Sequence, residues 1–465
     1  MQGKSTTVVA AVFAAALSLA SVCACAASRP AAPFAHGERV TLLGDSITHG
    51  GKYGTYLQLF WDLRFPGSET RIMNCGVSGG TASGGLQRWE KDVLAQEADR
   101  IFVMFGMNDV GHGYFEPKVA PAKSESGSAA AAASYTTNMT EIATRTLAAG
   151  KRLAIITPTP YDEYGTNLTA AVRTNCNAVG LARLASICRS LAAEHNAELV
   201  DLHAPLTSFV RGNRGFSFCR GDRVHPTAEG HIIMAAEILS QMGVSPYVAQ
   251  VEIDAGVGRV LRNDGAAVSQ LAADGSHVSF DYAPVRLPFP TAPEYSRAAA
   301  VYPVTEKMNL EILTVKGLAP GKYALAADGK ELGRFTEKEL AYGINLALLQ
   351  TPGAKLAMDA WKIAGELGSL QARQRGLVLV ENVAKGKGAD PSNPESVMST
   401  MGKFVEDIQK KGASYAGYYE GQLEQYRKFK PLEKKLRVDE DGCRVRLRTA
   451  AAKKWCARIT IAPAE

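Results

Sequence analysis

The sequence lacks the features that would point directly to nucleic acid, a membrane-embedded core or a zinc site. Its 52 lysines and arginines against 46 aspartates and glutamates leave a net charge of only +6, and no basic stripe is interleaved with aromatic residues. No Cys/His cluster has zinc-site spacing, and no repeat or heptad run stands out. Beyond the N-terminus no apolar run is long enough to span a membrane. We therefore expect no nucleic-acid partner and no transmembrane segment in the mature chain.

Residues 1–27 have the pattern of a secretory signal peptide. Lys4 precedes a short apolar run at 8–20, and small residues follow it, with cleavage expected after Ala26 or Ala27. This pattern predicts an exported protein, either periplasmic or extracellular. The stretch around Cys25 also loosely resembles a lipobox, so a lipid anchor on Cys25 is the alternative.

Six of the eight cysteines lie beyond the signal peptide. An exported protein permits disulfides, and Cys443 and Cys456 flank a predicted C-terminal hairpin, so we expect these two to pair. Cys176 and Cys188 fall on one predicted helix, too far apart along it to bond. We expect them to be small buried hydrophobic residues.

The length of 465 residues exceeds what one core usually serves and predicts two domains. Between residues 37 and 245 short apolar strands alternate with helices, which is typical of a parallel sheet covered on both faces. The expected strands are 39–43, 70–75, 99–105, 151–156 and 197–200, and the expected helices are 53–64, 84–97, 134–149, 167–194 and 226–242.

Residues 250–465 are expected to form a smaller β-rich module with a helical insertion. The pattern predicts helices at 354–375 and 395–428 and strands at 250–262, 277–284, 308–318, 322–325, 434–448 and 455–462. The tyrosines between Tyr415 and Tyr426 are candidates for a sugar-stacking platform, with packing on a helix face as the simpler alternative.

Polar residues gather where the strands of the first domain end, which is where ligands bind in a parallel sheet. Ser46 follows the first strand, at the turn into a helix, and such a turn presents both its hydroxyl and the N–H groups of the helix start. A glycine-rich loop at 74–81 follows the second strand, and Asn108 follows the third. Asp222 and His225 come after the fifth, on a loop that leads into a helix.

These residues can be assigned the parts of a nucleophilic site. Ser46 is the candidate nucleophile, and the neutral imidazole of His225 can take its proton. Asp222 lies three residues before His225, so one short loop can hold the carboxylate on the far ring nitrogen. The N–H groups of Ser46 and Gly79 and the side-chain amide of Asn108 can donate to a developing oxyanion.

Four blocks of sequence resemble the SGNH/GDSL hydrolase superfamily in their order and spacing. They are residues 44–48 around Ser46, the Gly79 loop, residues 106–109 around Asn108, and residues 222–226 around His225. The resemblance covers roughly residues 37–243. It implies a flavodoxin-like three-layer α/β/α fold, Ser46, His225 and Asp222 as a catalytic triad, Ser46, Gly79 and Asn108 as the oxyanion hole, and no metal or organic cofactor. Met107 departs from the family, because many members have glycine there.

Four further residues near these blocks are candidates for substrate contact: Asp45, His49, His112 and Arg223. His49 and His112 flank the site loops, with a surface or loop-bonding role as the alternative. Arg223 is a candidate for attracting an acidic sugar, with solvated surface charge as the alternative. The segment 117–133, rich in Ala, Ser, Lys and Pro, is interpreted as a mobile insertion, either a surface loop or a lid.

The resemblance implies a serine esterase that acts on a small-molecule or polysaccharide ester. Export, the attached module and the lack of an obvious long apolar groove favour deacetylation of a carbohydrate. A lipase or lysophospholipase on the same scaffold is the alternative, and a catalytically silent carbohydrate-binding protein is the alternative of another class.

Overall fold

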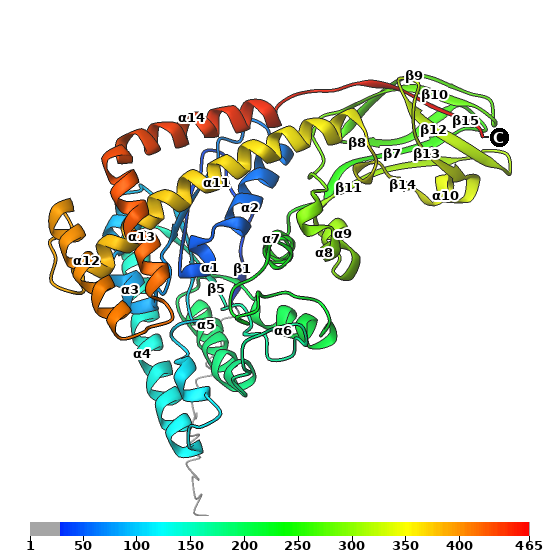
Figure 1. The fold of residues 1–465 in the computed structure, drawn as a ribbon. Helices are drawn as coiled ribbons and strands as arrows, with labels where there is room; N and C mark the ends of the chain where they lie inside the picture. The colour runs from blue at the N-terminus through cyan, green and yellow to red at the C-terminus, as the bar shows by residue number, and fades with distance from the viewer. Residues whose placement is uncertain (1–27, 465) are drawn as a thin grey trace, which may run out of the picture.

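The computed structural model describes residues 28–464, so the predicted signal peptide and Cys25 lie outside the described residues. The predicted α/β architecture is confirmed: a six-stranded, all-parallel sheet forms the first part of the chain, followed by a β-rich region (Figure 1). The order across the sheet is β1-β6-β5-β4-β2-β3. Its strands are β1 (Arg29–Pro30), β2 (Arg39–Gly44), β3 (Arg71–Gly76), β4 (Arg100–Met104), β5 (Arg152–Ile156) and β6 (Glu198–Val200).

Helices cover both faces of this sheet. Across the sheet, β3 lies on one side of β2, and β4, β5 and β6 follow on the other side. Because crossovers between parallel strands are right-handed, this reversal of direction places the intervening helices on opposite faces of the sheet. α2 packs against α7, whereas α4 packs against α3 and α5. The helices are α1 (Ser46–His49), α2 (Lys52–Arg64), α3 (Ala82–Gln87), α4 (Pro121–Ala148), α5 (Ala182–Glu194), α6 (His203–Gly212) and α7 (Ala228–Gln241).

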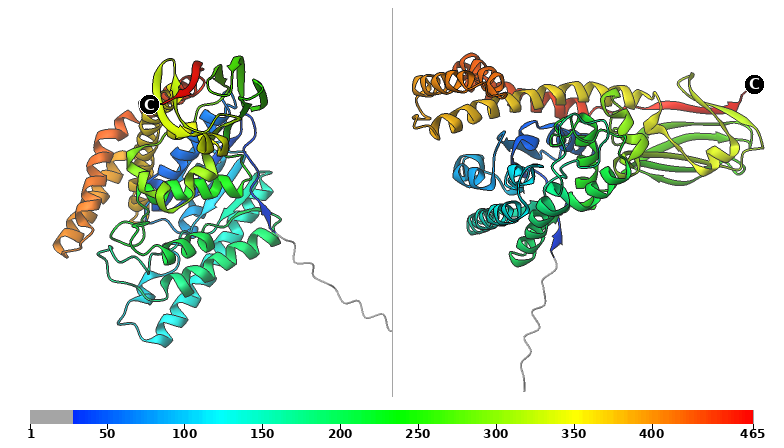
Figure 2. Two further views of the ribbon diagram at one scale, coloured as in Figure 1. Left: turned by 90° about the vertical axis from the view of Figure 1, so that its right-hand side faces the viewer. Right: turned by 60° about the horizontal axis from the view of Figure 1, so that its bottom comes forward.

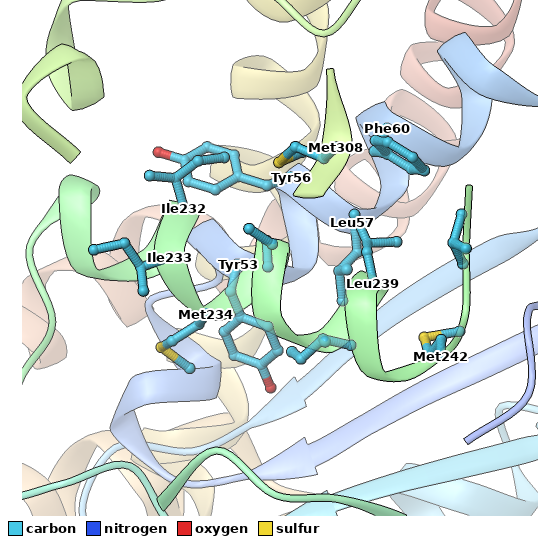
Figure 3. Close-up of a cluster of buried hydrophobic side chains, with 14 of the residues drawn as sticks. Tyr53, Tyr56, Leu57, Phe60, Ile232, Ile233, Met234, Leu239, Met242 and Met308 are labelled. Atoms are coloured by element: carbon cyan, nitrogen blue, oxygen red, sulfur yellow. The ribbon is translucent and has the colours of Figure 1, made fainter. Parts of the chain in front are cut away.

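The packing of α2 on α7 follows from their sequences. Apolar residues at helical spacing along α2, including Tyr53, Leu57 and Phe60, are buried against α7 (Figure 3). α7 is apolar around most of its surface because it lies between α2 and two short helices of the second region, α8 (Ser296–Val301) and α9 (Val304–Met308). This shared core joins the second region to the first.

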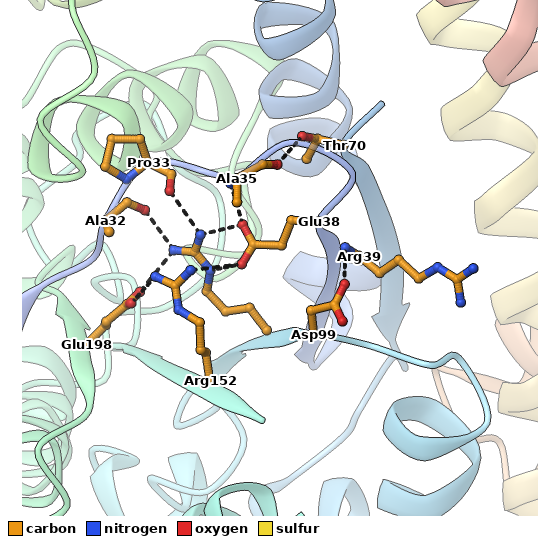
Figure 4. Close-up of polar contacts among 10 residues, drawn as sticks. Ala32, Pro33, Ala35, Glu38, Arg39, Thr70, Asp99, Arg152 and Glu198 are labelled. Atoms are coloured by element: carbon orange, nitrogen blue, oxygen red, sulfur yellow. Dashed lines mark hydrogen bonds and ion pairs between the residues drawn. The ribbon is translucent and has the colours of Figure 1, made fainter. Parts of the chain in front are cut away.

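A buried ionic cluster lies at the amino-terminal edge of the sheet, opposite the predicted site. Arg100, whose side chain is fully buried, donates to Glu38 at 2.7 Å and to Glu198 at 3.0 Å. Arg152 donates to the same two carboxylates (Figure 4). Because each of these charges is paired, the cluster can be held inside the protein, where it ties the starts of β4, β5 and β6 to the chain before β2.

The second region contains two sheets that share one apolar core. One has the order β13-β12-β15-β10-β9 and the other β14-β11-β7-β8, with β7 and β11 parallel. Figure 2 shows them extending away from the parallel sheet. The strands are β7 (Tyr247–Asp254), β8 (Arg259–Asp264), β9 (Ala266–Ala273), β10 (Val278–Pro284), β11 (Leu310–Lys316), β12 (Lys322–Ala327), β13 (Lys330–Thr336), β14 (Ile344–Asn345) and β15 (Ala457–Pro463), with α10 (Glu337–Tyr342) after β13.

The predicted helical insertion lies between β14 and β15. It consists of α11 (Pro352–Lys385), α12 (Pro394–Lys410), α13 (Ala416–Phe429) and α14 (Glu433–Ala451). α11 and α14 lie side by side and extend from the sheets back over the first region, where both contact α2 (Figure 1). The insertion therefore returns to the domain that carries the candidate site.

Three local predictions were wrong. Residues 434–448 form most of α14, because the apolar positions Leu436, Cys443 and Leu447 are buried at helical spacing, whereas Val438 is 70% exposed. The predicted disulfide between Cys443 and Cys456 does not form, because Cys443 lies on this helix and both residues are free thiols. The segment 117–133 mostly forms the start of α4: alanine favours helix strongly and Pro121 stands at its first position.

Several other helices differ in extent from their predictions. The predicted helix at 354–375 continues to Lys385 in α11, and the predicted helix at 395–428 is divided into α12 and α13. The predicted helix at 167–194 begins as a π-helical turn at Cys176–Leu181 and continues as α5. Cys176 and Cys188 are both buried and free, as expected. The predicted helix at 84–97 is divided into α3 and a π-helical turn at Glu90–Leu94.

Candidate active site

Ser46 lies at the carboxyl end of β2, as the first residue of α1. Asp45 caps the helix, since its carboxylate accepts the N–H of Ile47 at 2.9 Å. Gly44 is required for this turn, because a Cβ there would lie 2.2 Å from Oγ1 of Thr48 and 2.8 Å from the carbonyl of Met104. The first-turn N–H groups of a helix have no intrahelical acceptor, so the turn offers donors beside the hydroxyl.

The fold brings His225 and Asp222 to this hydroxyl across 179 residues of sequence. Nε2 of His225 lies 2.8 Å from Oγ of Ser46, and Nδ1 lies 2.7 Å from Oδ2 of Asp222. Oδ1 of Asp222 accepts the backbone N–H groups of Val224 and His225, each at 2.9 Å. The three side chains thus form one continuous chain of hydrogen bonds.

The electrostatics define the tautomer of His225. Partial burial raises the pKa of Asp222, but the hydrogen bonds from His225 and from the two backbone N–H groups outweigh it and bring the pKa to about 2. An ionised carboxylate only accepts hydrogen bonds, so Nδ1 must carry the proton that faces it. Nε2 then presents its lone pair to the hydroxyl of Ser46, as a general base requires.

The other two candidate oxyanion donors, Gly79 and Asn108, lie on neighbouring loops that contact each other. Gly79 is exposed and has a φ of +73°, a left-handed conformation that favours glycine. Nδ2 of Asn108 donates to the carbonyl of Gly80 at 2.9 Å, which leaves the second amide hydrogen for a ligand. Asp109 ties both loops together, because its carboxylate accepts the N–H groups of Ala82 and Gly106.

The part of the chain that carries this site is similar to known hydrolases. Residues 42–233 match the GDSL-like Lipase/Acylhydrolase family. An acetylxylan esterase of Geobacillus stearothermophilus is 28% identical over 222 residues, covering 44% of this chain and 94% of the relative. Residues 42–233 thus form a hydrolase domain of the SGNH/GDSL superfamily, and the protein is an ester-hydrolysing enzyme of that type.

The match to solved structures extends beyond the hydrolase domain. A gut microbial diltiazem-metabolizing enzyme is 25% identical to this SGNH hydrolase with a TM-score of 0.82, covering 94% of this chain and 100% of that chain. A solved structure of a catalytic mutant of the acetylxylan esterase Axe2 is 24% identical, covering 46% of this chain and 97% of that chain, with a TM-score of 0.38. The first of these two therefore shares the C-terminal region as well.

Two of the four predicted substrate contacts are scaffold residues of the SGNH hydrolase instead. Asp45 is only 2% exposed, and burial raises the pKa of its carboxyl group to about 7 while it caps α1. Arg223 is buried, and its guanidinium donates to the backbone carbonyls of Ala170, Asp162 and Gly165 at 2.7–3.1 Å. It thereby fixes the loop that carries Asp222 rather than facing a ligand.

His49 is likewise engaged by the protein rather than open to substrate. Its Nδ1 accepts the N–H of Ser78 at 3.1 Å, so the neutral ring carries its proton on Nε2. That nitrogen lies 3.3 Å from the carbonyl of Ala372 on α11. Burial is the main cause that lowers the pKa of His49 to about 4, which keeps the ring neutral at neutral pH.

His112 remains a candidate for substrate contact. Nδ1 lies 3.4 Å from Sγ of Cys176, and the ring lies 5.7 Å from that of Tyr161. Burial lowers its pKa to about 4, and the positive charge of Arg173 acts in the same direction. His112 is therefore neutral at neutral pH.

Sequence reasoning missed the contribution of the helical insertion to the site. A groove of about 370 Å³ runs beside Gly79, with the loop after β3 as one wall and α11 as the other. Its polar lining includes Ser78, Thr81, Gln87, Asn382 and Lys385. No local signal could place α11 here, because it comes about 300 residues after this loop.

Within residues 28–464 the hydrolase has no helix that combines the length and apolar character needed to cross a membrane. In the same part of the chain, no three His, Cys, Asp or Glu side chains gather in a way that could hold a metal ion.

Proposed function

We propose that this hydrolase is an exported serine esterase that removes acetyl groups from a carbohydrate through Ser46, His225 and Asp222. The observation that carries the proposal is the hydrogen-bond chain from Asp222 through His225 to Oγ of Ser46, at 2.7 and 2.8 Å. Its order of acid, imidazole and hydroxyl is what nucleophilic attack on an ester requires.

In the proposed mechanism Oγ of Ser46 attacks the acyl carbonyl while its proton passes to Nε2 of His225. The negative charge on the carbonyl oxygen is stabilised by the N–H groups of Ser46 and Gly79 and by the free amide hydrogen of Asn108. The intermediate then collapses, and the imidazolium gives its proton to the leaving alcohol. A water molecule, deprotonated by His225, attacks the acyl-enzyme, and the acid leaves as Ser46 regains its proton.

Two observations support a carbohydrate ester as the substrate. The 28% identical relative is an acetylxylan esterase. The groove beside Gly79 offers hydroxyl, amide and ammonium groups from Ser78, Thr81, Gln87, Asn382 and Lys385, beside the apolar side chains of Val77, Leu379 and Val383, so it can form hydrogen bonds with a hydroxyl-bearing alcohol. Export is proposed from the signal-peptide pattern of residues 1–27.

The first test compares hydrolysis of nitrophenyl acetate with that of nitrophenyl octanoate by the wild type and by Ser46→Ala. We expect acetate to be preferred and turnover to vanish in Ser46→Ala, while Ser134→Ala, an exposed serine on α4, changes nothing. Preference for octanoate would support a lipase instead. Turnover that survives in Ser46→Ala would contradict the mechanism.

The second test uses a matched histidine in the same chain. Asp274 and His277 repeat the Asp-x-x-His spacing in a turn of the C-terminal region, where Asp274 also accepts two backbone N–H groups. We expect His225→Gln to abolish release of acetate from acetylated xylan, and His277→Gln to leave it unchanged. Carbohydrate binding that persists without any turnover in the wild type would support a silent binding protein.

A further inference from the structure

Arg375, on the inserted helix α11, reaches the carboxyl end of β3. The residue is 6% exposed. Its Nε donates to the carbonyl of Gly76 at 3.0 Å and Nη2 to that of Cys75 at 3.4 Å. Both guanidinium Nη groups also donate to the buried carboxylate of Asp92, at 2.8 and 2.7 Å. A residue from the second region therefore holds the strand end from which the Gly79 loop departs.

Asp92 passes this connection on to the turn that carries Ser46. Arg88 lies 3.3 Å from the same carboxylate and donates through Nη2 to the carbonyl of Gly44 at 2.7 Å. That carbonyl also accepts the N–H of Val77 at 3.1 Å. Gly44 directly precedes Asp45 and Ser46, so one buried network links α11, the start of the Gly79 loop and the serine turn.

His49 forms a second link between α11 and the same loop. Its ring lies between the N–H of Ser78, next to Gly79, and the carbonyl of Ala372, one helical turn before Arg375. The Gly79 loop is consequently attached to α11 at its beginning, through Gly76, and again at Ser78. Oxyanion donors act well only when they are held in place before charge develops.

We propose that Arg375 is a positioning residue of the active site, through which the helical insertion holds the Gly79 loop and the Ser46 turn in reactive geometry. The inference rests on the proposed function of Ser46 and Gly79. It assigns the C-terminal insertion a part in the reaction at a site that lies about 300 residues earlier in the sequence.

The chain offers a matched control in Arg444 on α14. Arg444 is 4% exposed and also donates to β3, but at the opposite end of the strand, where Nη2 lies 2.8 Å from the carbonyl of Ile72. It is paired as well, with Glu440 at 2.8 Å. Loss of either arginine removes a buried charge from the same interface, whereas only Arg375 adjoins the site.

The experiment measures nitrophenyl acetate turnover, the rate at which a fluorophosphonate labels Ser46, and thermal unfolding for three variants of the full chain. The label forms a bond between Oγ and phosphorus and releases fluoride, so it reports the reactivity of Ser46 without a sugar. We expect Arg375→Met to lower kcat and the labelling rate about ten- to a hundred-fold with KM nearly unchanged, since a misplacement of about 1 Å has such effects. Arg375→Lys should recover part of the rate, and Arg444→Met should lower the melting temperature similarly with full activity.

Equal rates for Arg375→Met and Arg444→Met at equal stability would overturn the inference, as would a loss confined to KM. Arg375→Lys decides the matter if Arg375→Met does not fold: full activity in a folded Lys variant, whose single ammonium cannot reproduce the guanidinium contacts, would also overturn it. A wild type that neither turns over ester nor is labelled at Ser46 would instead overturn the proposed function.

Discussion

Replacement of Asp222 by asparagine tests the tautomer of His225 while leaving the loop intact. Oδ1 of Asp222 accepts two backbone N–H groups at 2.9 Å, and Oδ2 accepts Nδ1–H of His225 at 2.7 Å. In Asp222→Asn the amide oxygen keeps the two backbone bonds, so the amide nitrogen faces Nδ1. An amide N–H donates, which forces Nδ1 to accept and moves the ring proton to Nε2. Nε2 then has no lone pair for the proton of Ser46.

The expected loss is large because the wrong tautomer removes general-base catalysis. The corresponding change in an established Ser-His-Asp triad lowers kcat about 10⁴-fold, which corresponds to about 5.5 kcal/mol of transition-state stabilisation. We expect a loss of the same order in kcat on nitrophenyl acetate at pH 7.5. Thermal unfolding should change little, since both backbone hydrogen bonds remain.

The control is Asp274→Asn, which changes the same kind of turn in the C-terminal region, where Oδ1 of Asp274 accepts N–H groups at 2.9 and 2.7 Å. It should leave kcat unchanged. If Asp222→Asn retained activity within about ten-fold of the wild type, orientation of His225 by Asp222 would not be required, and the reasoning from the tautomer would be refuted.

Three further predictions concern the oxyanion, the helix cap and the far edge of the sheet. Asn108→Ala should lower kcat on nitrophenyl acetate about 10²- to 10³-fold with KM nearly unchanged; an unchanged kcat would remove Asn108 from the oxyanion hole. Asp45→Asn should stabilise the protein increasingly between pH 4 and 7. The reason is that burial raises the folded pKa of Asp45 to about 7, so the folded state binds more protons than the unfolded state in this window and the wild type loses stability as pH rises. Urea unfolding of the wild type and the variant at pH 5 and pH 7 measures this. An equal difference in their free energies of unfolding at the two pH values would contradict the prediction. Arg100→Met should lower the free energy of unfolding by about 3 kcal/mol in urea, because it removes the buried arginine shared by Glu38 and Glu198 and leaves them only the partly exposed Arg152. The kcat of the folded variant should stay within about two-fold of the wild type; a selective loss of kcat would contradict the placement of this cluster away from the site.

Local patterns in the sequence were sufficient for the parallel sheet and for the parts of the candidate site that lie within one loop. The apolar runs before Ser46, Gly79 and Asn108 correspond to β2, β3 and β4, because buried parallel strands are apolar along their whole length. The Asp222–His225 pair could also be predicted, since three residues of spacing bring a carboxylate to the imidazole within a single turn.

Local patterns failed where two kinds of structure fit the same residues. At each end of 434–448, apolar and polar residues alternate as they do in a strand. The segment nevertheless forms a helix, because packing against α11 buries Leu436, Cys443 and Leu447, which lie on one helical face. The segment 117–133 resembles a loop in composition, yet alanine-rich sequence continues readily into a helix once Pro121 begins it. Asp45 and Arg223 resembled exposed site residues because sequence does not reveal burial.

Only the tertiary structure decided which distant groups meet. Right-handed crossovers bring His225 within 2.8 Å of Ser46 across 179 residues. The insertion between β14 and β15 lays α11 over β3, so that Arg375 reaches Gly76 across 299 residues. No sequence spacing encodes such contacts, because they depend on how helices and strands pack once formed. The sequence by itself thus determined the chemical groups and their local order, whereas packing determined their partners, the burial that sets their pKa values, and the wall that α11 adds to the site.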